Sequence, residues 1–591
     1  MARERTHTCG ELRPRQVGET VTLAGWVNSY RDHGGVIFID LRDREGITQI
    51  VFHPEHAEAH ALADRLRNED VAEVSGKVLE RGIDDNGRSL VNPRLATGEI
   101  EVDADHLALL NKTETPPFTP DDAGKVSEEV RLKYRYIDLR RPYMQDILRT
   151  RHRVTKIMRD YFDDQGFYEI ETPFLCKSTP EGARDFLVPS RLQEGAFYAL
   201  PQSPQLFKQI LMVSGIEKYV QIVRCFRDED PRADRQAEFT QLDVEMSFID
   251  REQLMVVIEG LIRRIWKEVL DIDVPPLETM AYEEAIRRYG SDRPDLRFGM
   301  ELCDIGDIAG QTDFGVFRGA LDSGGIVKCI CVPGGAAMTR KDTDGLADWA
   351  KQFGAKGLAV TKIAAGGTLD TGIAKFLGDV AGALVDRVGG SEGDLLCFAA
   401  DSSVVVHRVL GELRLKLARE RDMIPENQWR WLWVVDFPAL AWNEDEKRWD
   451  SLHHPFTAPK DEDLDRLESD TANVLSKAYD LVLNGSELGG GSIRIHQQDV
   501  QSRIFSLLGI SPEEARVKFG FLLDALQYGA PPHGGIALGL DRIVMHLCGT
   551  SNIRDVIAFP KTQNGADLMT EAPSQVSDDQ LKELHLRLAL T

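Results

Sequence analysis

The stretch QIVRCFRDEDPRADRQAEFTQLDVEMSFI, residues 221–249, constrains the fold more than any other part of the chain. It reads as two strands joined by a charged loop. In the second strand Phe239, Gln241, Asp243 and Glu245 share one face, while the alternate apolar side chains share the other. One face therefore suits a protein core, and the other places an aromatic ring among polar groups.

The first strand and the loop add charges to that polar face. Alternation puts Arg227 with Glu229, and the loop contributes Arg235 and Gln236. A cation for a phosphate, an aromatic ring for a base and nearby carboxylates would form a nucleotide site without a glycine-rich loop. A surface hairpin that simply carries charge explains the stretch as well, so other regions must decide.

Length and composition limit the alternatives. The 591 residues exceed one core, so three or four domains are expected, and 42% hydrophobic with 28% charged residues is typical of globular proteins. No apolar run of about 18 residues occurs and the N-terminus lacks an apolar segment, which predicts a cytoplasmic chain without a membrane partner. The eight cysteines lack zinc spacing and are expected to be reduced thiols. A net charge of −25 argues against a general DNA binder, although a local patch can still hold one nucleic acid.

The N-terminal region, residues 1–112, is predicted to be an OB-fold β-barrel. Three strands are expected in residues 20–52 and two more before 112, with a helix-like segment between the third and the fourth. Phe38 falls on the polar face of its strand, where with Arg31 and Gln49 it would form a stacking platform for an unpaired base. A single exposed aromatic residue is the simpler alternative.

The middle of the chain is read as a linker, part of a catalytic domain and an insertion. Residues 113–143 are rich in proline and charge and are expected to be a hinge. An amphipathic helix with an apolar stripe from Val154 to Phe162 follows, then a strand that stops near Pro173. Glu181, Gln205 and Lys208 could together hold a small zwitterion. Residues 289–427 are rich in glycine and are read as an inserted α+β domain.

Two later stretches strengthen the nucleotide hypothesis. Asp480 and Glu487 flank a run of three glycines, and two carboxylates beside phosphate oxygens suit Mg²⁺, although a glycine bulge in an edge strand would look similar. In residues 534–545 a strand and a glycine turn precede a helix that begins at Leu540–Asp541. Arg542 would then lie in the first helical turn, where phosphate binding is favoured.

Taken in order, these motifs resemble the class II aminoacyl-tRNA synthetases. The stretches TPEGARDF, LPQSPQLFKQ, CFRDED with RADRQ, HHPF, GGGSIRIH and GLDR are similar to those of aspartyl-tRNA synthetases of the bacterial type, and the resemblance extends nearly end to end. No P-loop pattern competes for the nucleotide role.

The resemblance implies an α+β multidomain protein with an antiparallel six-stranded catalytic sheet flanked by helices, acting as a homodimer. The implied domains are an OB-fold anticodon-binding domain at 1–112, a hinge at 113–143, catalytic parts at 144–288 and 428–562, an inserted domain shared with tRNA-dependent amidotransferases at 289–427, and a C-terminal extension at 563–591. The implied reaction uses ATP to form aspartyl-adenylate, and the 3′ end of the tRNA then takes the aspartyl group.

The resemblance also implies roles for individual residues. Arg227 would hold the α-phosphate, Arg542 the γ-phosphate, and Phe239 would stack on adenine. Asp480 and Glu487 would ligate Mg²⁺. Further ATP contacts are expected from Asp228, Glu229, Gln236, Glu487, Gly539, Leu540 and Asp541. L-Aspartate would be bound by Lys208 and Arg494 at its side-chain carboxylate, with His453 nearby, and by Glu181, Ser203, Gln205, Arg227 and Asp243.

The sequence leaves two alternatives open for which tRNAs are charged. Phe38 would stack an anticodon base, and Arg31, Gln49 and Glu99 match positions that read base edges. At His33 the family has leucine in members strict for aspartate tRNA and often histidine in relaxed ones, which favours charging of both tRNA(Asp) and tRNA(Asn). The companion position, Ser89, lies in a loop whose alignment is uncertain.

A nucleic-acid binder without catalysis and an adenylate-forming enzyme without tRNA are the rivals from other classes.

Overall fold

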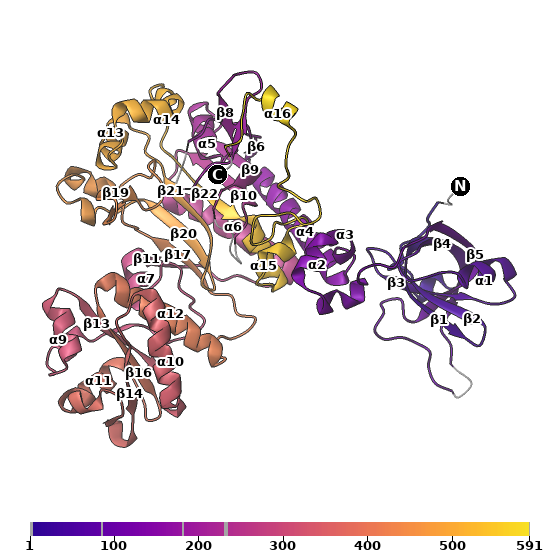
Figure 1. The fold of residues 1–591 in the computed structure, drawn as a ribbon, viewed down its shortest axis with the longest axis horizontal. Coiled ribbons are helices and arrows are strands. Elements are labelled where there is room, and N and C mark those ends of the chain that lie inside the picture. Colours follow the sequence, from indigo (N-terminus) through magenta and orange to yellow (C-terminus); the bar gives the residue numbers. More distant parts are fainter. Residues whose placement is uncertain (1–3, 84–86, 180–182, 230–234, 590–591) are drawn as a thin grey trace. The chain divides into compact units, whose positions relative to one another are not determined.

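The computed structural model describes residues 4–83, 87–179, 183–229 and 235–589 (Figure 1). The chain forms two compact units. The first combines residues 1–153, 230–236 and 544–577, and the second combines residues 154–229, 237–543 and 578–591. Within the described residues no helix is both long and apolar enough to cross a membrane.

The first unit begins with a closed five-stranded barrel in the order β1-β2-β3-β5-β4. Its apolar side chains alternate inward and include Val21, Ile39, Ile50 and Val102, all buried. The helix between the third and fourth strands is present, so the predicted OB-fold is confirmed. The elements are β1 (Thr20–His33), β2 (Val36–Arg42), β3 (Ile47–Phe52), α1 (Ala57–Ala63), β4 (Val71–Glu80) and β5 (Ile100–Asn111).

The segment 113–143, expected to be a linker, folds into short helices with a small core of their own. Phe118, Ala123 and Ile137 are buried together, and Ser127 caps a helix by accepting a hydrogen bond from the backbone of Val130. The apolar residues of this charged segment therefore form its core. The elements are η2 (Pro120–Lys125), α2 (Glu128–Lys133), α3 (Arg135–Asp138) and the long α4 (Pro142–Asp164).

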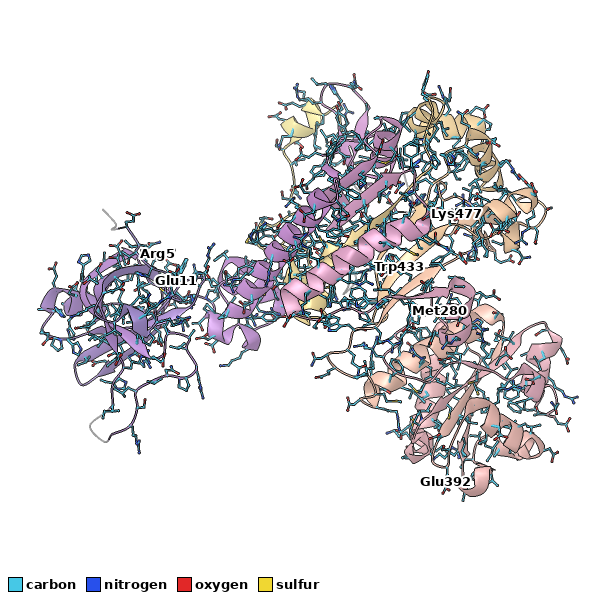
Figure 2. All side chains as sticks on the ribbon, turned by 180° about the vertical axis from the view of Figure 1, so that it is seen from behind. Arg5, Glu11, Met280, Glu392, Trp433 and Lys477 are labelled. Atoms are coloured by element: carbon cyan, nitrogen blue, oxygen red, sulfur yellow. The ribbon has the colours of Figure 1, made fainter. Side chains whose placement is uncertain are left out.

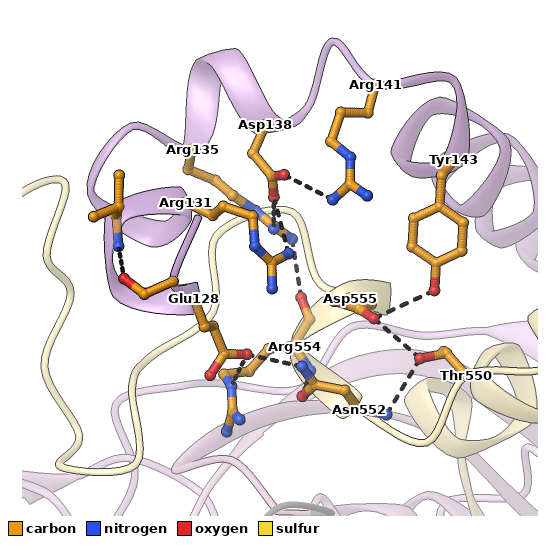
Figure 3. A network of polar contacts seen from close by, with 12 residues as sticks. Glu128, Arg131, Arg135, Asp138, Arg141, Tyr143, Thr550, Asn552, Arg554 and Asp555 are labelled. Carbon is orange, nitrogen blue, oxygen red and sulfur yellow. Dashed lines mark hydrogen bonds and ion pairs between the residues drawn. The ribbon is translucent and has the colours of Figure 1, made fainter. Parts of the chain in front are cut away.

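A polar network joins these helices to residues 550–558 of the same unit (Figure 3). Arg135 is buried and donates to the carbonyls of Arg554, Ile557 and Ala558 and to the Asp138 carboxylate at 2.6 Å. Nearby, Glu128 accepts from Asn552 and Arg554 at 2.8 and 2.9 Å. Charged side chains of segment 113–143, which was expected to be a linker, thus bind it to residues 550–558.

The second unit contains an eight-stranded sheet in the order β11-β17-β20-β21-β22-β10-β9-β6. The six central strands pair antiparallel, as predicted, and one short parallel strand is added at each edge. Met280 of the edge strand β11 and Trp433 of β17, both labelled in Figure 2, are buried in this region. The expected strand toward Pro173 is only two residues long, because its pairing with β9 ends at the hydrogen bond from Ile170 to Val220.

The bounds of the elements around this sheet follow the chain order. They are β6 (Tyr168–Glu169), β7 (Leu187–Pro189), β8 (Phe197–Ala199), α5 (Gln205–Val213), β9 (Lys218–Phe226), β10 (Glu238–Ser247), α6 (Arg251–Leu270), β11 (Glu278–Ala281), α7 (Tyr282–Tyr289), β17 (Trp431–Val435), β18 (Leu440–Asn443), β19 (Arg448–Ser451), β20 (Ala478–Leu483), β21 (Ser486–Ile493), α13 (Gln498–Leu507), α14 (Pro512–Leu526), β22 (His533–Gly539) and α16 (Asp578–Glu583). The helix α15 (Leu540–Cys548) begins where the sequence predicts it and crosses into the first unit, where η10 (Ile553–Val556) follows.

The inserted region forms a separate antiparallel sheet in the order β12-β13-β16-β14-β15, with an apolar cluster on each face. Arg414 on its long helix is buried and donates to the carbonyls of Asp295, Phe298 and Gly299, which ties the start of the insertion to that helix. The elements are β12 (Cys303–Asp304), α8 (Gly306–Ala309), α9 (Gly315–Asp322), β13 (Ile326–Val332), α10 (Arg340–Ala350), β14 (Ala359–Ile363), β15 (Leu369–Asp370), α11 (Ala381–Val388), β16 (Leu395–Asp401) and α12 (Ser403–Glu420).

The buried Arg135 network gives a stability prediction. Arg135→Met should destabilise the protein by about 3 kcal/mol or more, because it leaves three buried carbonyls without donors. The expected result in scanning calorimetry is a melting transition several degrees lower than that of the wild type. Arg149→Gln, at an exposed ion pair with Asp146, is the matched control and should shift stability by less than about 1 kcal/mol. Equal shifts for the two variants would contradict this account.

Candidate functional site

The floor of the candidate active site is a row of facing residues across the antiparallel sheet. Asp243 on β10 faces Ala537 on β22, which faces Gly490 on β21, which in turn faces Asp480 on β20. Three strand spacings put the two aspartates roughly 14 Å apart. The two residues between them, Ala537 and Gly490, are small.

One end of the row holds four buried charges. Lys208 on α5 contacts Asp243 at 2.9 Å and Glu245 at 3.5 Å, and Arg494, just after β21, contacts both carboxylate oxygens of Glu245. The four side chains are at most 2% exposed. Lys208 and Arg494, predicted as a pair, are indeed brought together, and the acidic residue that joins them is Glu245. The alternation in β10 had placed Glu245 on this face without giving it a role.

The cluster is neutral overall and its two carboxyl groups differ. Burial raises the pKa of Asp243 despite the opposing effect of Lys208. Burial also acts on Glu245, but Arg494 and Lys208 outweigh it and hold the pKa of that carboxyl below its usual value. The Oδ2 atom of Asp243 is buried and has no hydrogen-bond partner among the described residues. An unpaired acceptor at this point favours a ligand that carries a donor.

The two histidines of the HHPF motif contact opposite ends of the row: His454 contacts Arg494, and His453 contacts Asp480. The Arg494 guanidinium donates to Nε2 of His454 at 2.7 Å, and burial, followed by Arg494, holds the pKa of His454 well below its usual value, so the ring is neutral. His453, which the sequence analysis placed beside the cation pair, instead contacts Asp480 at 3.2 Å. Sequence reasoning missed His454, although the motif contains it.

The other end of the row holds the two predicted metal ligands. A Cβ atom built on Gly490 would lie 2.5 Å from Oδ1 of Asp480 and 3.7 Å from Oε1 of Glu487, so both carboxyl groups lean over the same glycine. Burial, followed by repulsion from Asp480, raises the pKa of Glu487. A divalent cation would relieve that repulsion, and the residues present fit Mg²⁺. The described residues contain no cluster of three or more His, Cys, Asp or Glu that could hold a metal ion by themselves.

Two of the predicted ATP-binding residues, Arg227 and Phe239, contact each other. The guanidinium of Arg227, just after β9, lies 5.1 Å from the centre of the Phe239 ring. Asp541 at the start of α15 accepts from the backbone of Thr240 at 2.9 Å, and Arg542 donates to the carbonyl of Glu487 at 2.7 Å. Strand β10, helix α15 and the carboxylate pair are therefore held against one another.

Four other residues that were predicted to bind the substrates contact protein groups or are buried in the core. The oxygen of the Gln236 amide accepts from the backbone N–H of Lys561 at 2.8 Å, and its nitrogen donates to the carbonyl of Lys561 at 3.2 Å. The sequence predicted that Gln236 contacts ATP, whereas in the structure its amide binds the protein main chain. Gln205 donates to Gln209, and Ser203 accepts from the backbone of Gln205. Leu540 is buried, so its side chain belongs to the core.

The other four predicted residues have fewer informative contacts. The carbonyl of Asp228 accepts from Arg184 at 3.4 Å. Gly539 ends β22 beside Arg542, and Glu229 makes at least one polar contact. Glu181 lies outside the described residues.

The residues of the predicted nucleic-acid platform lie close together on the barrel. Arg31 faces Phe38 across β1 and β2, and His33 packs edge-on against the Phe38 ring with centroids 5.8 Å apart. Arg31 and Gln49 are hydrogen-bonded at 3.2 Å. Glu99 is exposed, as are His33 and Ser89. The loop containing Ser89 is only partly described, so its position relative to His33 stays a prediction.

Comparison with known proteins agrees with this geometry. Residues 127–563 match the family model for tRNA synthetases class II (D, K and N), and residues 21–110 match that for the OB-fold nucleic acid binding domain. The chain is 54% identical to the Aspartate–tRNA(Asp/Asn) ligase of Desulfotalea psychrophila, covering 99% of this chain and 96% of that protein. It is 55% identical to the Aspartate–tRNA ligase of Halalkalibacterium halodurans, covering 99% and 98%.

Solved structures share the fold at low sequence identity. Asparaginyl-tRNA synthetase from Pyrococcus horikoshii, complexed with asparaginyl-adenylate, superposes with a TM-score of 0.59 at 21% identity over 95% of this chain and 98% of that one. The crystal structure of a putative aspartyl-tRNA synthetase from Leishmania major gives a TM-score of 0.59 at 20% identity over 95% of this chain and 94% of that one. With a family model matched over most of its length and relatives above 50% identity, this chain belongs to the class II tRNA synthetases of the D, K and N group.

Proposed function

We propose that this chain is an aspartate–tRNA ligase that activates L-aspartate with ATP and transfers the aspartyl group to the 3′ end of tRNA. The observation that carries the proposal is the buried cluster of Lys208, Asp243, Glu245 and Arg494 at one end of the sheet row. Asp243 supplies an unpaired acceptor for an ammonium group, and the two cations supply donors for a carboxylate. Aspartate carries both groups.

Selection of aspartate over asparagine follows from hydrogen-bond polarity more than from net charge. Glu245 neutralises both cations in part, yet Lys208 and Arg494 each retain an N–H beyond their contacts with the residues that the structure describes. These groups can only donate. A carboxylate accepts from both, whereas the amide of asparagine turns an NH₂ group toward a donor and leaves it unpaired.

ATP is proposed to lie across the sheet from Phe239 on β10 toward Asp480 and Glu487. Arg227, released from the Phe239 ring, neutralises the charge that develops on the α-phosphate while the aspartate carboxylate attacks and pyrophosphate leaves. Arg542, anchored by the carbonyl of Glu487, holds the far end of the triphosphate. Asp480 and Glu487 would hold Mg²⁺, which supplies charge neutralisation to the phosphates when bound. Orientation and electrostatics account for the step without a general base.

The tRNA partner is proposed to be read by the barrel face around Phe38 and to include tRNA(Asn) as well as tRNA(Asp). Exposed His33 beside the Phe38 ring supports the relaxed reading. The relatives in D. psychrophila and Caldanaerobacter subterraneus, each 54% identical to this chain, are named Aspartate–tRNA(Asp/Asn) ligase, whereas the one in H. halodurans, 55% identical, is named Aspartate–tRNA ligase. A strict enzyme for tRNA(Asp) is therefore the alternative.

A homodimer working in the cytoplasm completes the proposal. Tyr168, Phe174 and Leu175, which follow the long helix α4, are 64, 46 and 54% exposed. Three large apolar side chains close together in sequence beside a sheet edge support a surface that a second copy covers.

The role of Arg227 predicts a defined loss of activation. Arg227→Ala should slow aspartate-dependent ATP–pyrophosphate exchange by about 10²–10³-fold, because a cation is lost where charge develops. Arg224→Ala is the matched control, since this arginine pairs with Glu238 on the same strand pair and should change the rate less than threefold. A change below threefold in Arg227→Ala itself would refute the role.

Donor-only recognition predicts discrimination against asparagine. Pyrophosphate exchange with asparagine should show kcat/KM at least about 10³-fold below that with aspartate, because a buried donor would meet an amide NH₂. Purified enzyme with chromatographically cleaned asparagine provides the measurement. Comparable rates with the two amino acids would end the assignment to aspartate.

The relaxed reading predicts that transcripts of tRNA(Asp) and tRNA(Asn) are both aspartylated. His33→Leu should then lower kcat/KM for tRNA(Asn) about 5–10-fold more than for tRNA(Asp), as expected for one altered base contact. His106→Leu, elsewhere on the barrel, is the control and should affect both transcripts equally. No charging of tRNA(Asn) by the wild type would instead support the strict alternative.

A further inference from the structure

A line of three buried polar side chains leads from helix α5 to the start of strand β22. Gln205 on α5 donates to the side-chain oxygen of Gln209, one turn further along the same helix, at 3.0 Å. The amide nitrogen of Gln209 lies 3.2 Å from Nε2 of His533, and Nδ1 of His533 lies 2.8 Å from the carbonyl oxygen of Pro531. All three side chains are buried, so bulk water does not compete for these contacts.

The chemistry of the partners allows only one orientation for each group in this line. The carbonyl of Pro531 can only accept, so the proton of the His533 ring lies on Nδ1. Burial lowers the pKa of His533 despite the opposing effect of Glu245, so the ring is neutral and its Nε2 is an acceptor. Gln209 must therefore meet the ring with its NH₂ group and turn its oxygen toward the NH₂ group of Gln205.

The oxygen of the Gln205 amide is left as an acceptor beside the candidate aspartate site. It accepts no hydrogen bond from the residues that the structure describes. Gln205 lies three residues before Lys208 on α5, so the two side chains project from the same side of the helix, and Lys208 contacts Asp243 at 2.9 Å. An ammonium group has three N–H donors, of which the unpaired Oδ2 of Asp243 can accept one. The Gln205 oxygen supplies a second acceptor that is oriented before the ligand arrives.

We propose that His533 and Gln209 are positioning residues for amino-acid recognition, which hold the oxygen of the Gln205 amide toward the α-ammonium group of aspartate. This inference rests on the proposed function, because it requires the buried cluster of charges to bind an amino acid. Neither residue needs to touch the substrate. Without the line, the Gln205 amide turns freely, and in its other orientation it presents an NH₂ group to an ammonium group that can only donate.

Two amide variants of His533 test this role. An asparagine side chain reaches the place of Nδ1 and a glutamine side chain the place of Nε2. His533→Asn therefore keeps the contact with Pro531 and loses Gln209, whereas His533→Gln keeps an acceptor for Gln209. In aspartate-dependent ATP–pyrophosphate exchange, His533→Asn should raise KM for aspartate about 10-fold, close to the loss of one hydrogen bond to a charged group. His533→Gln, the matched control, should stay within about threefold of the wild type.

The other kinetic constants separate positioning from a general disturbance of the sheet. KM for ATP and kcat should stay within about twofold of the wild type in both variants, because the line ends at the amino acid and its contact is present in ground and transition states alike. Gln209→Met cuts the line one link closer to Gln205 at similar volume and should raise KM for aspartate by the same factor. This second variant decides the matter if His533→Asn does not fold. An unchanged KM for aspartate in Gln209→Met would overturn the positioning role.

A double-mutant cycle with Gln205→Ala separates the inference from the proposed function. Gln205→Ala should itself raise KM for aspartate at least as much as Gln209→Met does. If the line acts through Gln205, then Gln209→Met should change that KM less than about twofold in the Gln205→Ala background. A full additional effect would overturn the inference while aspartate activation stands. A wild-type protein without aspartate-dependent exchange would instead refute the proposed function on which the inference rests.

Discussion

The candidate active site depends on four charged side chains that are buried away from water. Lys208, Asp243, Glu245 and Arg494 come from a helix, a strand and the residue after another strand, and each has an oppositely charged partner within 3.5 Å. Burial of such a group costs several kcal/mol, and only good geometry offsets that cost. Apolar side chains of similar volume would be at least as stable in these positions. The arrangement is therefore better understood as one that serves ligand binding than as one that stabilises the fold.

The small residues between the acidic positions matter for the same reason. Ala537 and Gly490 lie between Asp243 and Asp480 in the row, and any larger side chain at Gly490 would meet the Asp480 carboxylate. Glycine at position 490 therefore leaves room for the carboxylates of Asp480 and Glu487, which lean over it. An amino acid and a nucleoside triphosphate are proposed to lie side by side along this row. The glycine run of the sequence thus has a steric purpose.

A common device recurs at both candidate sites. Groups that can only donate or only accept are used to fix neighbours whose orientation would otherwise be open. In the catalytic unit, Lys208 and Arg494 are proposed to reject an amide because they offer donors alone. In the barrel, Arg31 can only donate to the Gln49 amide, and the Glu101 carboxylate can only accept from it. Under this proposal, the choice of amino acid depends on hydrogen-bond polarity more than on net charge.

Alternation and glycine turns in the sequence alone determined the barrel and the start of α15, because these are local signals that tertiary contacts here reinforce. The antiparallel sheet was implied only by the resemblance of the motifs to a known family. The sequence also grouped Phe239, Asp243 and Glu245 on one face. It could not show that Glu245 joins Lys208 to Arg494, that His454 and not His453 contacts Arg494, or that Gln236 is bonded to Lys561. It read the helices of 113–143 as a linker, since the partners that satisfy their charges lie more than 400 residues away. Pairings between distant charges depend on how the elements pack, and only the tertiary structure decided them.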